Sequence, residues 1–253
     1  MDDIADSVMS IVLPTRKRPL RFKSFMDSVI EMATYPENLE FLVYVDDDDA
    51  ESIGVTEEYK HLNVKLFTGE RMQGLMAVQN FLYTKSSGDI IGYLSDDTRL
   101  LTKGWDVKIR QSFPADMIAL VCPYERHKGF KKATHGFLSR RAVEAVSTAE
   151  CGHFVPGCFT SCFSDQWLHE VYLAVGRFVP LRTVEISHDH PGFSKKRRNP
   201  DLALAKYWDE VYLQKNTPQK FYADERRFKR TAHVRAEWVE KLLSACIGED
   251  NEQ

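Results

Sequence analysis

Two adjacent carboxylates, Asp96 and Asp97, follow Ser95 at the end of the apolar run IIGYL at residues 90–94. Carboxylates at the end of a buried strand repel each other and lose hydration, so the pair is costly unless a cation binds there. Mg²⁺ and Mn²⁺ prefer oxygen ligands, and they often take only one or two from the protein while substrate phosphates complete the shell. The pair therefore predicts a site for a divalent cation and a phosphorylated ligand.

Polar groups also follow three other apolar runs. Thr15-Arg16-Lys17-Arg18 follow the first run, Asp46 to Asp49 follow the second, and His188 and His190 come after a strand-like segment. Ligands of open α/β sheets bind beyond the carboxyl ends of the strands, so these groups are expected to converge. Histidines at i and i+2 of an extended chain point to the same side, so one cation can use one or both. The alternatives are a solvated acidic turn and a polar turn.

The elements that must position these groups follow from the spacing of apolar residues. Short apolar runs predict strands at 10–14, 41–46, 64–67, 89–94, 117–123 and 178–187. Helical spacing predicts helices within 19–36, 72–86, 164–176, 201–214 and 222–247. Strands that alternate with helices and are almost entirely apolar are typical of a parallel sheet covered on both faces. We therefore expect an α/β fold, a single Rossmann-like domain with a mostly parallel central sheet flanked by helices.

Composition narrows the class of protein. The 253 residues are 43% hydrophobic and 28% charged, with a net charge of −3, which argues against a surface built entirely for nucleic acid. No apolar run is long enough to span a bilayer, and the acidic start MDDIADSVMS lacks the layout of a secretion signal. Five cysteines, an odd number, favour a reducing compartment. We expect a cytoplasmic protein without a membrane span.

Local basic segments stand out against the net negative charge. They are RKRPLRFK at 16–23, GFKK at 129–132, KKRR at 195–198 and RRFKR at 226–230. Solvated surface is one interpretation, a track for an anionic acceptor such as DNA is another, and Lys195 and its neighbours could cover a diphosphate as a lid. The group of Cys151, His153, Cys158 and Cys162 fits no zinc-finger spacing, so free cysteines are favoured over zinc.

Four motifs come in an order that resembles a known family. IVLPTRKRP, VYVDDDD, GLMAVQN and GDIIGYLSDD follow one another as in GT-A glycosyltransferases, and they are most similar to those of glycosyltransferase family 2. The resemblance covers roughly residues 9–192. It implies a GT-A-like catalytic domain at 1–192, followed by a basic loop and a C-terminal helical extension at 193–253.

The resemblance also implies the ligands and their contacts. The donor would be a nucleoside-diphosphate sugar, with a UDP-sugar favoured, and the cofactor would be Mn²⁺ or Mg²⁺. The acceptor is open, an anionic polymer such as modified DNA being one candidate. Donor contacts carried over from the motifs are Pro14, Thr15, Arg16, Arg18, Asp46, Asp47, Gly74, Ala77, Asn80, Ser95 and Asp96. Trp105, which follows Gly104, is added as a pocket wall, with a core position as its alternative.

Metal and catalytic roles follow in the same way. Ser95-Asp96-Asp97 occupies the family's metal-binding Asp-x-Asp position, with serine in place of the first aspartate. This departure leaves Asp97 as the direct ligand. His188 and His190 match the position of a C-terminal metal histidine.

Asp165, at the start of a helix, resembles the family's catalytic carboxylate and would be a general base, which suits inversion. Its structural alternative is an ordinary first-turn acid. Trp167 and His135 are candidate walls of the acceptor pocket.

Two other function classes stay open. A nucleotidyltransferase also holds magnesium on carboxylates at strand ends, but it would favour a glycine-rich loop after the first strand, and PTRKRP has no glycine. A non-catalytic nucleic-acid-binding domain on a degenerate transferase fold is supported by Ser95. The presence of Asp97, Asp165 and both histidines counts against it.

Overall fold

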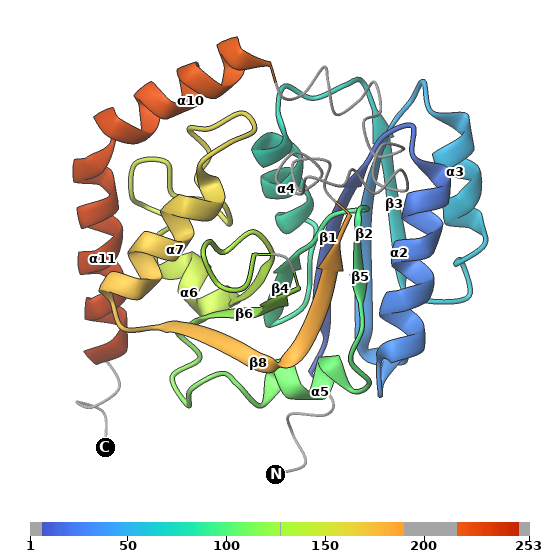
Figure 1. The fold of residues 1–253 in the computed structure, drawn as a ribbon, viewed down its shortest axis with the longest axis horizontal. Coiled ribbons are helices and arrows are strands. Elements are labelled where there is room, and N and C mark those ends of the chain that lie inside the picture. The colour runs from blue at the N-terminus through green and yellow to red at the C-terminus, as the bar shows by residue number, and fades with distance from the viewer. Residues whose placement is uncertain (1–6, 127, 190–216, 248–253) are drawn as a thin grey trace, which may run out of the picture.

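The structure is a computed structural model, and it describes residues 7–126, 128–189 and 217–247. In these ranges the chain forms an eight-stranded sheet with the strand order β3-β2-β1-β4-β7-β6-β8-β5 (Figure 1). The strands are β1 (Met9–Thr15), β2 (Leu39–Asp46), β3 (Val64–Gly69), β4 (Ile90–Tyr93), β5 (Thr98–Leu100), β6 (Leu120–Glu125), β7 (Gly136–Ser139) and β8 (Phe178–His188).

The half of the sheet from β3 to β4 is parallel throughout. In the register of β1, Ile11 lies between Phe41 of β2 and Gly92 of β4, and β2 runs parallel to β3. The predicted mostly parallel sheet is therefore confirmed, and the carboxyl ends of β1, β2 and β4 meet at one edge. Two short strands were not predicted, and both are antiparallel: β7 lies between β4 and β6, and β5 pairs with β8.

Helices cover both faces of the sheet, as the apolar strands predict. One face packs against α2 (Pro19–Met32), α3 (Ala50–Glu57) and α5 (Trp105–Arg110). The other packs against α4 (Leu75–Tyr83), α6 (Arg140–Ala145) and α7 (Ser164–Ala174). Alternation along β1 divides its side chains between the two cores, with Val12 in one and Ile11 and Leu13 in the other.

The end of the chain forms two helices where the sequence predicts one at 222–247. These are α10 (Pro218–Arg230) and α11 (Ala232–Ile247), and the chain turns between them at Thr231, whose hydroxyl donates to the carbonyl oxygen of Arg227 at 2.8 Å. A threonine that bonds back to the preceding turn disturbs a helix, which explains the break. The helix predicted at 201–214 lies outside the described residues.

Both helices lie on the side of the molecule opposite α2 and α3 (Figure 1). Trp238 of α11 is fully buried, and its ring meets that of Trp167 in α7 at 5.6 Å between centroids. The C-terminal extension therefore shares the core of the sheet domain. Among the helices of the described ranges, none has the length and apolar character needed to cross a membrane.

Candidate functional site

A cleft of about 850 Å³ opens at the edge where β1, β2 and β4 end. Its walls come from the β1–α2 turn, the start of α4, the segment after β4, the β6–β7 loop, the start of α7 and the start of α10. The cleft brings together many of the residues that the sequence singles out, namely Pro14, Thr15, Arg16, Arg18, Asp46, Gly74, Ser95, Asp96, Asp97, Asp165 and His188.

Three of the proposed donor contacts lie outside the lining of this cleft. Asp47 is an exposed turn residue, and Ala77 is on the exposed side of α4. Asn80 uses its side-chain amide to bond both main-chain groups of Val155, each at 3.0 Å. Of the three donor contacts expected in GLMAVQN, only Gly74 therefore lines the cleft, and Asn80 holds a neighbouring loop.

Two tryptophans expected as pocket walls are in the core instead. Trp105 is fully buried under the opposite face of the sheet, where its indole nitrogen donates to the carbonyl oxygen of Val29 at 3.0 Å. Trp167 is also fully buried, on the inner face of α7. Burial of such large apolar rings is strongly favourable, and this outweighs any role at the surface. The predicted contacts His190 and Lys195 lie outside the described residues.

The donor side of the cleft is a network of aspartates and arginines. The hydroxyl of Thr15 donates to Asp96 at 2.8 Å, and the guanidinium of Arg18 donates to the other oxygen of Asp96 at 3.2 Å. Burial raises the pKa of Asp96 above its ordinary value, with the charge of Asp97 adding to the effect and Arg18 opposing it. Asp96 is thus oriented by β1 and the start of α2.

The acidic run at 46–49 has divided roles. Of its four aspartates, all of which the structure describes, only Asp46 lines the cleft, where Arg16 pairs with it. Arg16 also reaches Asp48 with two bonds of 2.7 and 2.9 Å. Asp49 caps α3 by accepting from the main chain of Ser52 at 3.1 Å. The run is therefore part binding surface and part helix cap.

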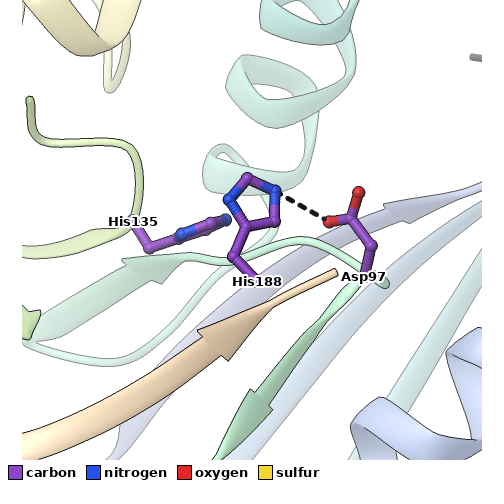
Figure 2. Close-up of side chains that lie close together, drawn as sticks. All are labelled: Asp97, His135 and His188. Carbon is purple, nitrogen blue, oxygen red and sulfur yellow. Dashed lines mark ion pairs between the residues drawn. The ribbon is translucent and has the colours of Figure 1, made fainter. Parts of the chain in front are cut away.

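Asp97, His135 and His188 point toward one another above the carboxyl end of β4 (Figure 2). Their ligand atoms all lie within 4.8 Å of each other. His188 Nε2 is 3.5 Å from Asp97 Oδ1, and the two imidazole rings meet edge to face at 4.6 Å between centroids. The hydroxyl of Ser95 donates to Asp97 at 2.5 Å and lies 2.9 Å from His135 Nε2. Ser95 therefore links the carboxylate to one histidine.

Glu125 lies behind both histidines. Its carboxylate oxygens are 3.5 Å from His188 Nδ1 and 3.9 Å from His135 Nδ1, and its side chain is almost fully buried. A carboxylate facing Nδ1 favours the tautomer that keeps the proton on that atom, which leaves Nε2 free to bind a metal. His188 turns its Nε2 toward Asp97, and His135 turns its Nε2 toward Ser95.

Buried charges set the electrostatics of this group. Burial alone would raise the pKa of Asp97, but contact with His188 and the hydroxyl of Ser95 hold it well below its ordinary value. Burial alone would lower the pKa of His188, but Asp97 and Glu125 raise it above the ordinary value. A carboxylate and two imidazoles in this arrangement fit a divalent cation, because both ligand types bind such ions.

Asp165 lies in the first turn of α7 and lines the same cleft. The loop before it is tied to α4, since the main-chain nitrogen of Leu75 donates to the carbonyl oxygen of Thr160 at 2.8 Å. Gly74 makes this close approach possible: its φ is +101°, and a Cβ there would lie 2.7 Å from that same oxygen. The loop that leads into α7 and Asp165 is therefore anchored at the start of α4.

The sequence suggested that His135 lines the acceptor pocket. In the structure it lies beside Asp97, a position that the sequence did not predict. The residue comes just before β7, and Gly136 of β7 pairs with Tyr93 at the end of β4. This antiparallel pairing brings His135 next to Ser95. The available signal was a histidine directly before the short apolar run GFL, but three apolar residues are too few to predict a strand.

The family model described as glycosyl transferase family 2 matches residues 10–149, more than half of the chain. The chain belongs to glycosyl transferase family 2. The resemblance seen in the four motifs is thereby confirmed. No curated protein matches the chain in sequence.

Solved structures with the same fold include several glycosyltransferases. The mannosyltransferase PcManGT from Pyrobaculum calidifontis, in complex with GDP-Man and Mn²⁺, has a TM-score of 0.61 at 12% identity, over 98% of this chain and 76% of that one. S. aureus TarS with UDP-GlcNAc has a TM-score of 0.59 at 11% identity, over 95% and 73%. GalNAc-T7 with UDP, GalNAc and Mn²⁺ has 0.56 at 15%, over 72% and 43%. The GT-A-like fold of this family 2 member is confirmed.

Proposed function

We propose that this family 2 member transfers a sugar from a nucleoside-diphosphate sugar to a hydroxyl acceptor in a metal-dependent reaction. The observation that carries the proposal is the group of Asp97, His135 and His188, which shares one cleft with Asp165. Neighbours of the same fold support it, because PcManGT holds GDP-Man and Mn²⁺ and TarS holds UDP-GlcNAc in their structures.

The three buried side chains would hold the metal. Two imidazoles beside one carboxylate favour Mn²⁺ over Mg²⁺, because Mg²⁺ prefers an all-oxygen shell and Mn²⁺ accepts nitrogen ligands. Bound there, the ion would neutralise the charge that develops on the diphosphate leaving group. Asp96, held by Thr15 and Arg18, would bind the ribose or a water molecule, and Asp46 would bind the base or ribose.

Asp165 would carry the chemistry on the acceptor side. The acceptor oxygen forms a bond to the anomeric carbon of the sugar while the bond from that carbon to the diphosphate breaks, and the electron pair leaves with the nucleoside diphosphate. The acceptor proton goes to the Asp165 carboxylate. A base on the face opposite the leaving group gives inversion.

Products distinguish the alternatives. A panel of UDP- and GDP-sugars with Mn²⁺ should yield a nucleoside diphosphate and free sugar by slow transfer to water. Release of pyrophosphate from nucleoside triphosphates would indicate a nucleotidyltransferase, and turnover of neither would favour a binding domain.

The variant that tests the base is Asp165→Asn, which keeps size and removes basicity. Donor binding should stay close to that of the parent, while turnover should fall about a hundredfold or more. A variant that turns over as fast as the parent would show that Asp165 is not the general base. A variant that loses donor affinity would place Asp165 among the donor contacts.

A further inference from the structure

Helix α10 contributes to the cleft although it lies outside the stretch that matches the family model. Lys220 and Phe221, on its first turn, line the cleft beside the β6–β7 loop and the start of α7. Phe221 is 45% exposed and Tyr222 is 56% exposed. Phe221 lines the cleft and Tyr222 packs against it, so the two rings form an exposed apolar surface at its edge, which favours a ligand that covers them.

A buried carboxylate fixes α10 in this place. Asp224 is fully buried and accepts from the main-chain nitrogens of Thr160, Ser161 and Cys162 at 3.2, 2.9 and 3.0 Å. These residues form the loop that leads into α7 and Asp165. Such charge-assisted bonds are strong, so the start of α10 has a defined position relative to the proposed base.

The exposed rings continue into a basic loop. Phe221 lies 5.2 Å from Phe163 and 5.7 Å from Tyr222 between ring centroids. The ammonium group of Lys132 lies over the ring of Phe163, 5.7 Å from its centroid. Lys132 and Lys220 both line the cleft, so this wall combines aromatic and cationic groups.

Charge along this wall differs from that of the whole chain. Segments 126–132 and 218–230 together hold nine lysines and arginines and two acids, one of which is the buried Asp224, whereas the chain has a net charge of −3. Three of these cations, Lys128, Lys132 and Lys220, line the cleft. A groove that combines such cations with exposed rings suits a single nucleic-acid strand, whose phosphates pair with the cations while its bases stack. A polyanion without bases would leave the rings uncovered.

We propose that the acceptor is a single-stranded nucleic acid, bound along the wall formed by α10 and residues 128–132. This inference rests on the proposed glycosyltransferase function and names the substrate for the acceptor side of that cleft. A nucleotide hydroxyl bonds to the anomeric carbon, the carbon–diphosphate bond breaks, and the proton goes to Asp165. Bases stack on Phe221 and Tyr222, and phosphates lie near Lys132 and Lys220.

Fluorescence anisotropy with a labelled oligothymidylate tests the wall directly. The parent should bind, and its affinity should fall with salt. Lys220→Glu should weaken binding and lower the slope of log affinity against log salt by about 0.7 or more, the share of one phosphate contact. Phe221→Ala should weaken binding about tenfold, as expected for the loss of a stacked base. Matched controls are Lys60→Glu and Leu243→Ala, both exposed and away from the cleft, and they should bind as the parent does.

Several outcomes would overturn the inference. They are a parent that does not bind the strand at low salt, a Lys220→Glu variant that binds it as the parent does, and a parent that binds heparin but not the strand. Loss of Mn²⁺-dependent nucleotide-sugar binding in Lys220→Glu would make Lys220 a donor contact and would also overturn it. Hydrolysis of the nucleotide-sugar by a parent that ignores the strand would refute this inference alone and leave the proposed function standing.

Discussion

Replacing Glu125 with glutamine should weaken Mn²⁺ binding about tenfold to a hundredfold, the usual loss when a carboxylate behind ligating histidines is removed. In free energy this is about 1.4 to 2.8 kcal/mol. The substitution keeps the size of the side chain and removes the charge that lies 3.5 Å from His188 Nδ1 and 3.9 Å from His135 Nδ1. An uncharged amide holds the two Nδ1 protons less firmly, so both rings lose their preference for presenting Nε2.

Calorimetric titration with Mn²⁺ near neutral pH measures this loss, and a thermal melt without metal shows whether the variant is folded. Glu144→Gln is the matched control, because Glu144 is exposed on α6 and does not line the cleft. A Glu125→Gln variant that binds Mn²⁺ as tightly as the parent would refute the reasoning that Glu125 orients the histidines.

Three further predictions concern pH and stability. Mn²⁺ affinity should fall as the pH drops, because an imidazole must be neutral to bind a metal and the pKa of His188 lies above its ordinary value; an affinity that is flat across the acidic range would argue against histidine ligands. Gly74→Ala should lower the free energy of unfolding by about 2 kcal/mol, since a Cβ would lie 2.7 Å from the Thr160 oxygen at a φ of +101°. Gly54→Ala, in α3 with open space around it, should be neutral or stabilising in the same denaturant titration, and equal losses in both variants would contradict the argument. Hydrogen bonds and an ion pair outweigh burial and lower the pKa of Glu40 to about 2, so its contribution to stability is present above its ordinary pKa and is lost as the pH falls toward 2. Glu40→Gln should therefore remove about 2 kcal/mol at neutral pH, after allowance for solvent screening, and should flatten the acid limb of stability against pH; an unchanged acid limb would show that Glu40 does not contribute.

The sequence predicts much of the donor side of the cleft, because its polar residues come directly after the apolar runs that form the parallel strands. Buried parallel strands give long apolar runs, and polar groups that follow such runs must lie at the carboxyl edge. Thr15, Asp46 and Asp97 are therefore found together in the cleft, as expected.

Other features depend on contacts that a local pattern does not contain. His135 reaches Asp97 through the pairing of β7 with β4, and β7 has only four residues. Trp105 has the same local context whether it lines a pocket or fills a core, and only the packing of α5 decides. Asp224 is one of several charges in a basic helix by sequence, and its burial depends on the loop at residues 160–162.

The central claim is that a metal held by Asp97, His135 and His188 binds the diphosphate of a nucleotide-sugar. Calorimetry of UDP and GDP, with and without Mn²⁺, tests this most directly on the parent and on Asp97→Ala. The account predicts that at least one of the two nucleotides binds the parent only when Mn²⁺ is present, and that Asp97→Ala loses this binding while its thermal melt without metal is at least as high as that of the parent. Nucleotide binding that needs no metal, or that persists unchanged in Asp97→Ala, would contradict the account.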